Sequence, residues 1–570
     1  MKSILLKARY ALTQKQVSAR DYLYSGEADT MQIDGKTHDL IELDKLDRCM
    51  DTTNTLAGRI TLSHSLGNPS TDLDHIKAKQ AATLEIIENE KLRSGLETVF
   101  SAASRYQEDF HRLLFGRFIG LLSDPATRLE YQGYGYASFR YGIRFLPSVI
   151  EKIDELPETG SSYLTGAIAK LKDFKSTSSY ELLTAPVYLR PGRIMPRSER
   201  KLFSFRFKPS PFKLSIILLL ALLFYSIPVY LQLNPMSASM MSFFMFLTIF
   251  IYLPVVGSID RDHVIYPFRK ALLKAGEVEH AVEGLGQLDE LLSFYRYFAA
   301  NKNKTCLPEV RNTDRCIISL GKVCHPVLGF NNEKYIANDF NNRDKSLVFI
   351  SGPNSGGKTA LCKTLALTQV MAQSGSVILA RSGTLSITDR ICYQAPADYA
   401  VGQAPGLAST PTDYTAGQAP GLASTPAGYM PGQAAGYGIP GRAAEDEGRF
   451  GMELRRTREI FFSTTKKSLV ILDELSEGTS HQEETKIAVM ILNGFIRIGN
   501  ATILVSHNYD LARILEDQDA GVFYKFYLEN NSPAFTLTAG ISEFSHAELV
   551  AARIGFSQTD IDRHLEDLSL

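Results

Sequence analysis

Apolar residues recur at helical spacing in the first part of the chain. From Leu43 to about Leu122 the pattern is helical, and one stretch repeats apolar positions in alternating steps of four and three residues. This spacing predicts a long helix with one face in the core of a helical bundle. That face consists of Leu92, Leu96, Val99, Ala103, Tyr106, Phe110 and Leu113. Helical patterning returns over Val264–Asn301.

The second half of the chain contains short apolar runs that are typical of buried strands. Leu347–Ile350, Ser468–Leu472 and Ala501–Ser506 are such runs, and Val377–Ala380 is a further candidate. A helical stretch, Ala360–Ala372, follows the first run closely. Strands that alternate with helices predict a mostly parallel sheet, with its site at the C-terminal ends of the strands.

Two long uncharged runs lie between these parts. Leu214–Leu233 and Met240–Gly257 contain no Asp, Glu, Lys or Arg, and each is near the length that spans a hydrocarbon core. We therefore predict a two-helix transmembrane hairpin, with a lipid membrane as the partner of residues 214–257. The alternative is a hydrophobic hairpin buried in a soluble core, but two adjacent runs of this length are hard to bury in such a domain.

Basic residues around the runs predict their orientation. Residues 190–213 carry eight Lys and Arg residues, and Arg261, Arg269 and Lys270 follow the second run. Positive charge accumulates on the cytoplasmic side of a span, so we expect a cytoplasmic-membrane protein with both soluble parts in the cytoplasm. The basic stretch could contact DNA, but beside a membrane span it favours anionic lipid headgroups.

A tandem repeat interrupts the second half of the chain at residues 396–441. Tyr399, Tyr414 and Tyr429 recur every fifteen residues, and the octet APGLASTP occurs twice. The segment is rich in Gly, Pro and Ala and has too little apolar content for a packed core, so we predict a disordered loop. A solenoid is the alternative, but it would need bulkier repeats.

Composition excludes few functions. A net charge of −1 excludes a globally basic nucleic-acid-binding protein, although local basic patches remain compatible with it. The six cysteines show no CxxC pair and no metal-site spacing, which fits reduced thiols in a cytosolic compartment. A chain of 570 residues is long enough for several domains.

The clearest chemical signal is the sequence SLVFISGPNSGGKT at residues 346–359. It has the spacing of a phosphate-binding loop between a strand and a helix, a context that disfavours the alternative of a chance glycine turn. Backbone N–H groups and the helix N-terminus would hold the phosphates of ATP, Lys358 would reach the β- and γ-phosphates, and Thr359 would bind Mg²⁺. The expected nucleotide-binding residues are Gly352, Pro353, Asn354, Ser355, Gly356, Gly357, Lys358 and Thr359.

Acidic residues and a histidine follow the later strands. Asp473 and Glu474 end the run Ser468–Leu472, and His507 follows Ala501–Ser506. We expect Asp473 to bind Mg²⁺ through its water shell, Glu474 to orient or deprotonate the attacking water, and His507 to reach the γ-phosphate. The alternatives are an acidic pair that caps the next helix and a structural histidine.

These motifs carry a family resemblance. GPNSGGKT, LVILDELSEGTS and ATILVSH together resemble the ATPase domain of the MutS mismatch-repair family, a branch of the ABC-type ATPases. CHPVLGFNNEKYIAND resembles the MutS segment that holds the adenine, with Tyr335 where that family usually has a stacking aromatic residue. Met50–Pro69 and Gly284–Phe298 resemble two parts of the MutS core. The resemblance implies ATP and Mg²⁺ as cofactors, a homodimer with composite ATP sites, and DNA as a partner.

Departures from the family pattern limit these implications. Only about forty residues precede the core-like part, so the mismatch-reading and connector domains are expected to be missing. The uncharged hairpin stands where the family has its DNA clamp. The segment Glu447–Leu454 resembles the family's signature run but lacks the serine expected to meet the partner's γ-phosphate, which leaves Gly448 and Arg449 as candidates for that contact.

The expected fold is an α/β P-loop ATPase domain of ABC/MutS type, preceded by an all-α, lever-like core that the transmembrane hairpin interrupts. The expected division is an N-terminal segment and first core half at 1–205, a basic flank and hairpin at 206–262 with spans at 214–233 and 240–257, a second core half at 263–310, and the ATPase domain at 311–570.

The leading functional hypothesis is a membrane-anchored MutS-like ATPase in which ATP hydrolysis drives conformational change in a homodimer. The alternative is a signalling or transport-type membrane ATPase without mismatch recognition, although two spans per chain are few for a substrate pathway and neither contains an ionisable residue. A third hypothesis is a scaffold that binds ATP and hydrolyses it slowly.

Overall fold

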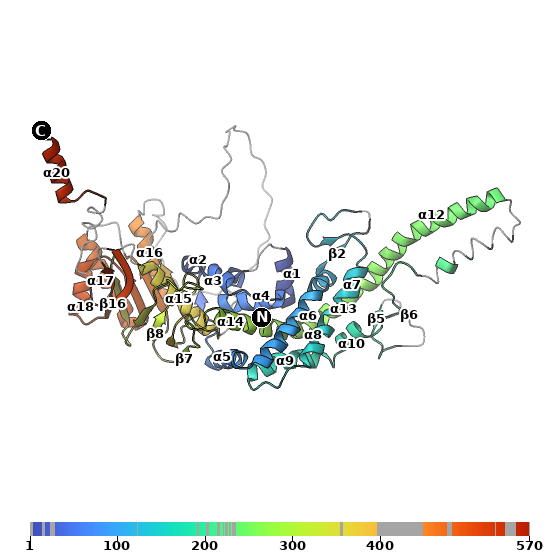
Figure 1. The fold of residues 1–570 in the computed structure, drawn as a ribbon, viewed down its shortest axis with the longest axis horizontal. Coiled ribbons are helices and arrows are strands. Elements are labelled where there is room, and N and C mark those ends of the chain that lie inside the picture. The colour runs from blue at the N-terminus through green and yellow to red at the C-terminus, as the bar shows by residue number, and fades with distance from the viewer. Residues whose placement is uncertain are drawn as a thin grey trace, which may run out of the picture.

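The described residues form an elongated molecule with three parts (Figure 1). A mixed α/β part lies at one end, a helical part lies in the middle, and helix α12, Pro235–Asp260, extends from the other end. This computed structural model describes residues 4–13, 18–22, 29–121, 123–190, 193–200, 205–213, 235–353, 357–395, 449–475, 481–529, 532–541 and 554–568, with isolated positions between 217 and 230. The repeats at 396–441 lie outside these residues.

The helical part joins segments that are far apart in the sequence. The face predicted for a long helix lies on α6, Glu90–Phe115, where Leu92, Val99 and Phe110 are buried. Helix α14, Glu277–Ala300, packs against α4, Leu56–Gly67, and α9, Ser162–Phe174. The other helices described up to α13 are α1 Ile4–Thr13, η1 Ala19–Tyr22, α2 Gly35–Ile41, α3 Leu43–Met50, α5 Leu73–Glu88, α7 Tyr136–Gly142, α8 Phe145–Ile153, α10 Ser178–Thr184 and α13 Tyr266–Lys274.

A buried aspartate fixes the start of α4 against α14. Asp289 on α14 accepts hydrogen bonds from the backbone N–H and the hydroxyl of Thr55, both at 2.7 Å, and from the backbone N–H of Asn54. Gly58 allows this approach, because a Cβ there would lie 2.3 Å from Asp289 Oδ2. Together these contacts tie the two parts of the helical region to each other.

A buried ion pair joins α5 and α14 and gives a stability prediction. Lys79 Nζ lies 2.7 Å from Glu290 Oε1, and the side chains are 3% and 0% exposed. Glu290→Leu leaves an unpaired ammonium in the core, so we expect a loss of about 3–5 kcal/mol in unfolding free energy. The double variant Lys79→Met/Glu290→Leu removes both charges and should be close to the parent. Urea unfolding measures both, and equal losses in the single and double variants would contradict the prediction.

The predicted transmembrane hairpin is wrong. Within the part of the chain that the structure describes, no helix is long and apolar enough to cross a membrane. Most of residues 214–233 lie outside that part, and residues 240–257 lie within α12. Helix α12 continues without a break through a π-helical turn, η2 Arg261–Ile265, into α13. The uncharged run 240–257 is therefore one section of a longer helical stretch and not a separate helix with the predicted bounds. The predicted location in the cytoplasmic membrane and the predicted lipid contact fail with the hairpin.

The α/β part is built on a seven-stranded sheet in the order β1-β12-β13-β14-β10-β15-β16. All neighbouring strands are parallel except β15 and β16, which are antiparallel. The strands are β1 Gln32–Ile33, β10 Leu347–Ser351, β12 Arg390–Gln394, β13 Leu469–Asp473, β14 Ala501–Val505, β15 Val522–Glu529 and β16 Ser532–Ala539. The three central strands, β13, β14 and β10, are buried throughout, as expected for a parallel sheet with helices on both faces.

The two faces of this sheet belong to different cores. Val348 and Ile350 of β10 pack in the large core that includes α15, whereas Leu347 and Phe349 pack in a second core with residues of α17 and α18. The helices here are α15 Lys358–Gln373, α16 Arg449–Ser463, α17 His481–Ile498, α18 Tyr509–Asp517 and α20 Gln558–Leu568.

Smaller sheets complete the described fold. A four-stranded sheet beside the main one has the order β7-β11-β8-β9. The strand predicted at Val377–Ala380 is not formed; Ile378 there makes only an isolated bridge to Cys306. The strands of the smaller sheets are β2 Arg117–Phe118, β3 Glu130–Tyr131, β4 Tyr188–Arg190, β5 Arg193–Met195, β6 Phe205–Arg206, β7 Glu309–Arg311, β8 Ile318–Val323, β9 Asn338–Asn341 and β11 Ser382–Ser386.

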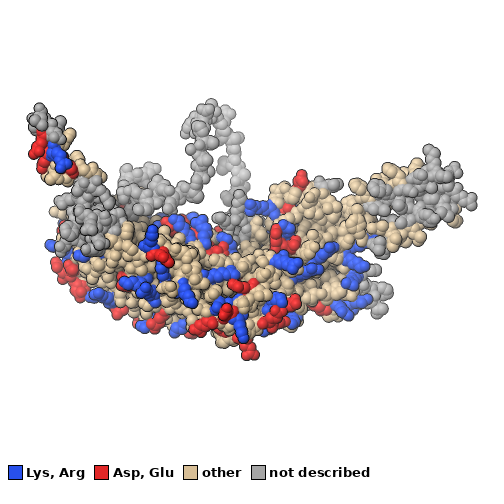
Figure 2. Space-filling view, in the orientation of Figure 1, with Lys and Arg blue, Asp and Glu red and all other residues tan. Residues whose placement is uncertain are grey.

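Charged residues of both signs are mixed over the face of the molecule shown in Figure 2. Lys and Arg are interspersed there with Asp and Glu. This mixed surface agrees with the formal net charge of −1.

Candidate nucleotide site

The parallel sheet brings the candidate residues together at one edge. Strands β10, β13 and β14 are adjacent and parallel, so their C-terminal ends meet. The phosphate-loop sequence follows β10, Asp473 ends β13, and His507 lies just after β14. In open α/β sheets this edge is where ligands bind.

Two glycines give the loop its shape. Gly352 has φ +136° and Gly357 has φ +92°, values that side-chain-bearing residues rarely adopt. A Cβ on Gly352 would lie 3.2 Å from Phe526 Cβ, and one on Gly357 would lie 3.3 Å from the Phe535 ring. Gly357 also caps the N-terminus of α15, whose first N–H groups form a site suited to phosphate.

Lys358 points back into the loop. Its ammonium donates hydrogen bonds to the carbonyl oxygens of Gly352 at 2.7 Å and Pro353 at 2.9 Å. Its side chain is buried, and burial lowers the pKa of Lys358 to about 8, against the opposing effect of the Glu474 and Asp473 charges. The buried ammonium thus lies where a polyphosphate on this loop would find a positive charge.

Thr359 and Asp473 form a pair of oxygen donors suited to Mg²⁺. Thr359 Oγ1 donates to Asp473 Oδ2 at 2.9 Å, and Asp473 is only 4% exposed. Burial raises the pKa of Asp473, while hydrogen bonds from Thr359 and Tyr393 oppose this shift. Mg²⁺ in nucleotide sites is commonly bound by one or two such protein oxygens together with phosphates. Among the described residues, no group of three or more His, Cys, Asp or Glu side chains is placed to hold a metal ion by itself.

Glu474 and His507 stand beside Lys358. His507 Nε2 lies 3.0 Å from Lys358 Nζ and 3.6 Å from Glu474 Oε1. An ammonium group can only donate, so His507 Nε2 accepts here, and the Glu474 contact is too long for a hydrogen bond. Glu474 has φ +62°, and its N–H donates to Val505 O at 3.0 Å, which fixes this unusual backbone beside β14.

The remaining candidates make contacts with other residues or fall outside the described residues. Tyr335 is partly buried, and its hydroxyl interacts with Thr364 on α15 and with the backbone of His325. Asn354, Ser355, Gly356 and Gly448 lie outside the described residues, and Arg449 begins α16 without a described side chain.

Two aromatic residues beside the loop were not found from the sequence. Tyr393 at the end of β12 donates from its hydroxyl to Asp473 Oδ2 at 3.1 Å. Phe535 on β16 lies against Gly357. The φ angle of Phe535 is +53°, and the side-chain amide of Asn338 donates a hydrogen bond to the carbonyl oxygen of Phe535. The sequence signal for Tyr393 was the rule that the strand ends of a parallel sheet meet, whereas no signal pointed to Phe535, because β16 is antiparallel to β15.

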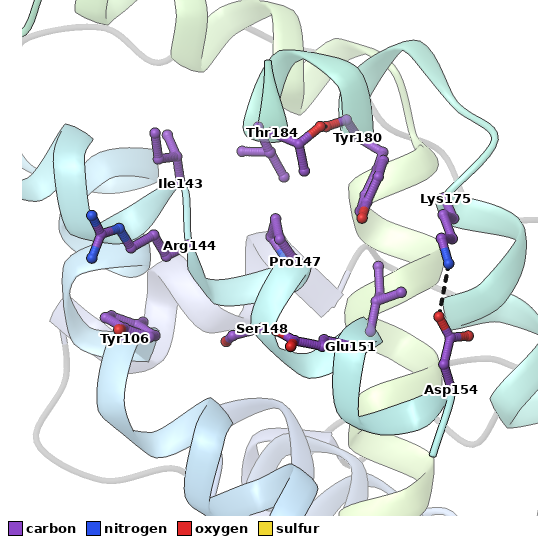
Figure 3. A pocket seen from close by; sticks show the side chains of 12 residues that line it. Tyr106, Ile143, Arg144, Pro147, Ser148, Glu151, Asp154, Lys175, Tyr180 and Thr184 are labelled. Carbon is purple, nitrogen blue, oxygen red and sulfur yellow. Dashed lines mark hydrogen bonds and ion pairs between the residues drawn. The ribbon is translucent and has the colours of Figure 1, made fainter. Parts of the chain in front are cut away.

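A cavity in the helical part does not share any of these residues. It has a volume of about 580 Å³ and is lined by residues of α6, α8 and α10, among them Tyr106, Pro147 and Tyr180 (Figure 3). The ion pair between Lys175 and Asp154, 2.8 Å long, lies at its edge. The sheet edge therefore remains the candidate site for nucleotide chemistry.

A comparison with protein families places one match in the second half of the chain. Residues 438–557 match MutS domain V. A DNA mismatch repair protein MutS from Alkaliphilus oremlandii is 28% identical over 244 residues, which cover 42% of this chain and 22% of that protein.

Proteins named endonuclease MutS2 match at similar identity. The one from Streptococcus uberis is 26% identical over 301 residues, covering 50% of this chain and 32% of that protein. The one from Thermus thermophilus is 28% identical over 247 residues, covering 43% of this chain and 27% of that protein. The matches thus cover between 22% and 32% of the length of these relatives.

Proposed function

We propose that this chain binds and hydrolyses ATP at the sheet edge after β10. Its match to MutS domain V and its similarity to MutS and MutS2 proteins support membership of the MutS family. The observation that carries the proposal is the convergence of five side chains from three strand ends: Lys358, Thr359, Asp473, Glu474 and His507. A phosphate loop, a buried carboxylate and a second carboxylate beside a histidine are the components of an ATPase site.

Each residue has a distinct role in this proposal. The loop N–H groups and Lys358 hold the phosphates, and binding of phosphate would replace the contacts of Lys358 with the Gly352 and Pro353 carbonyls. Thr359 and Asp473 would hold Mg²⁺, which supplies charge stabilisation to the phosphoryl group. Glu474 takes a proton from the attacking water, and His507, beside Lys358, lies within reach of the γ-phosphate.

The finer parts of the proposal rest on the family. We infer a homodimer in which the signature segment at the start of α16, with Gly448 and Arg449, completes the partner's ATP site. Closing and opening of such a dimer would move the helical part through α14, which Asp289 ties to α4. Tyr335 is proposed to contact the adenine.

DNA binding is proposed from the names of the relatives, which include a DNA mismatch repair protein. The experiment is phosphate release from ATP by the purified full chain with and without duplex, mismatched or branched DNA, together with DNA retention at several salt concentrations. We expect turnover to change with DNA and retention to weaken as salt rises, because phosphate contacts release counterions. No DNA retention at low salt would contradict the DNA role while leaving the ATPase proposal intact.

A binding-only scaffold is the competing function. Lys358, Thr359 and Asp473 would suffice for nucleotide binding alone, whereas the position of Glu474 beside His507 favours turnover. Measured hydrolysis that depends on Glu474 would exclude the scaffold.

A further inference from the structure

Tyr393 makes a contact with the candidate metal ligand that the roles above do not use. Its side chain is fully buried, and its hydroxyl donates to Asp473 Oδ2 at 3.1 Å. The same oxygen accepts a hydrogen bond from Thr359 Oγ1 at 2.9 Å. Two hydroxyl donors on a single carboxylate oxygen fix the rotation of the carboxylate about its Cβ–Cγ bond.

Tyr393 itself is held by a segment from the other end of the chain. Strand β1 pairs with β12 from Gln32 opposite Arg390 to Ile33 opposite Ile391. Past Ile391, the next edge contact comes from Thr37 on α2 and not from β1. Thr37 Oγ1 accepts a hydrogen bond from the backbone N–H of Tyr393 at 3.1 Å. The two residues are 356 positions apart in the sequence. The edge of β12 beside the site is therefore completed by residues 31–41.

Residues 31–41 are also joined to α16, the helix that contains most of the signature segment. Asp34 caps α2 by accepting the N–H of Thr37 at 2.7 Å. Its other oxygen, Oδ2, lies 2.8 Å from Arg456 Nη2 on α16. A continuous series of contacts thus runs from α16 through Asp34, Thr37 and Tyr393 to Asp473.

We propose that Tyr393 is a positioning residue that orients Asp473 for Mg²⁺ in the nucleotide site, and that residues 31–41 hold Tyr393 in place through Thr37. The inference rests on the proposed ATP function. A hydroxyl that only fills the core would be insensitive to the metal, whereas this one shares its acceptor oxygen with Thr359, the other proposed Mg²⁺ ligand.

The test compares Tyr393→Phe with Tyr297→Phe in the full chain. Tyr297 is a matched control, because it is 1% exposed and its hydroxyl donates to Pro326 O at 2.7 Å, a neutral acceptor in the helical part. Binding of a fluorescent ATP analogue is measured while Mg²⁺ is titrated. We expect Tyr393→Phe to raise the Mg²⁺ concentration for half-maximal binding about tenfold, the value of one hydrogen bond to a charged group. Binding without Mg²⁺, and kcat at saturating Mg²⁺, should stay near the parent values.

Thr37 supplies a second and independent variant. Thr37→Val removes the acceptor of the Tyr393 N–H and should raise the Mg²⁺ concentration for half-maximal binding, as Tyr393→Phe does. Thr37→Ser keeps the acceptor, so its Mg²⁺ requirement should equal that of the parent. An unchanged Mg²⁺ requirement in Tyr393→Phe, or the same shift in Tyr297→Phe, would overturn the proposal. If the parent protein binds no nucleotide, both this proposal and the proposed ATP function are overturned. If the parent binds nucleotide but Tyr393→Phe has no effect, only this proposal is overturned.

Discussion

Replacing Glu474 by glutamine is expected to lower kcat for ATP hydrolysis about 100- to 1,000-fold and to leave ATP binding near the parent value. The amide keeps the size of the side chain but cannot take a proton from water. Glu474 lies 3.6 Å from His507, and its backbone conformation is fixed by the hydrogen bond to Val505, so the substitution should not rearrange the loop. Steady-state phosphate release, together with binding of an ATP analogue, measures the two effects separately.

Glu516→Gln is the matched control for this substitution. Glu516 lies exposed on α18, the helix that follows β14, and belongs to no part of the proposed site. We expect its hydrolysis rate to equal that of the parent. Turnover that survives in Glu474→Gln would show that this carboxylate is not the catalytic base.

Replacing Lys358 by methionine is expected to weaken ATP binding in the presence of Mg²⁺ at least about 100-fold, because the phosphates lose a buried, charge-assisted partner. Methionine has a similar length, so the loop should keep its packing. Equilibrium binding of a fluorescent ATP analogue measures the loss. Lys363→Met on the same helix is the control, since Lys363 pairs with Glu42 and not with the loop. Unchanged affinity in Lys358→Met would contradict the proposed phosphate contact.

The buried position of Lys358 also predicts how folding stability changes. Its pKa falls from the ordinary value of 10.5 to about 8 through burial. A depressed lysine pKa means that the unfolded chain binds the proton more tightly, so this group destabilises the fold at pH 7 and its cost disappears as the pH rises from about 8 to about 10.5. Lys358→Met removes the ammonium, so we expect a thermal midpoint at pH 7 no lower than that of the parent. A large drop would mean that lost nucleotide binding reflects unfolding.

Local signals in the sequence located the loop and the residues at the strand ends. An apolar run followed by glycines, a lysine and a hydroxyl residue identifies its own strand, turn and helix, and the structure places β10 and α15 there. Asp473 and His507 follow runs that form β13 and β14. The sequence of each strand does not reveal its neighbours in the sheet. The expectation that the strands are parallel was sufficient to predict that their C-terminal ends lie at the same edge.

The predictions that were wrong, and the residues that were not predicted, share one physical cause, because they depend on contacts between residues far apart in the sequence. Val377–Ala380 is apolar and buried but packs as irregular chain, while β12, with Arg390 and Gln394 at its ends, has a weaker apolar pattern and forms the strand next to β13. Tyr393 and Thr37 meet only because β1 joins the edge of the sheet. The transmembrane hairpin was inferred from the length of the uncharged runs and their basic flanks, which do not reveal that α12 runs on into α13.

The decisive measurement of ATP hydrolysis compares phosphate release by the purified full chain with that of Glu474→Gln at the same Mg²⁺ and ATP concentrations. We expect Mg²⁺-dependent release by the parent and a rate at least about 100-fold lower in the variant. Release by the parent that is no faster than in the variant would contradict this expectation.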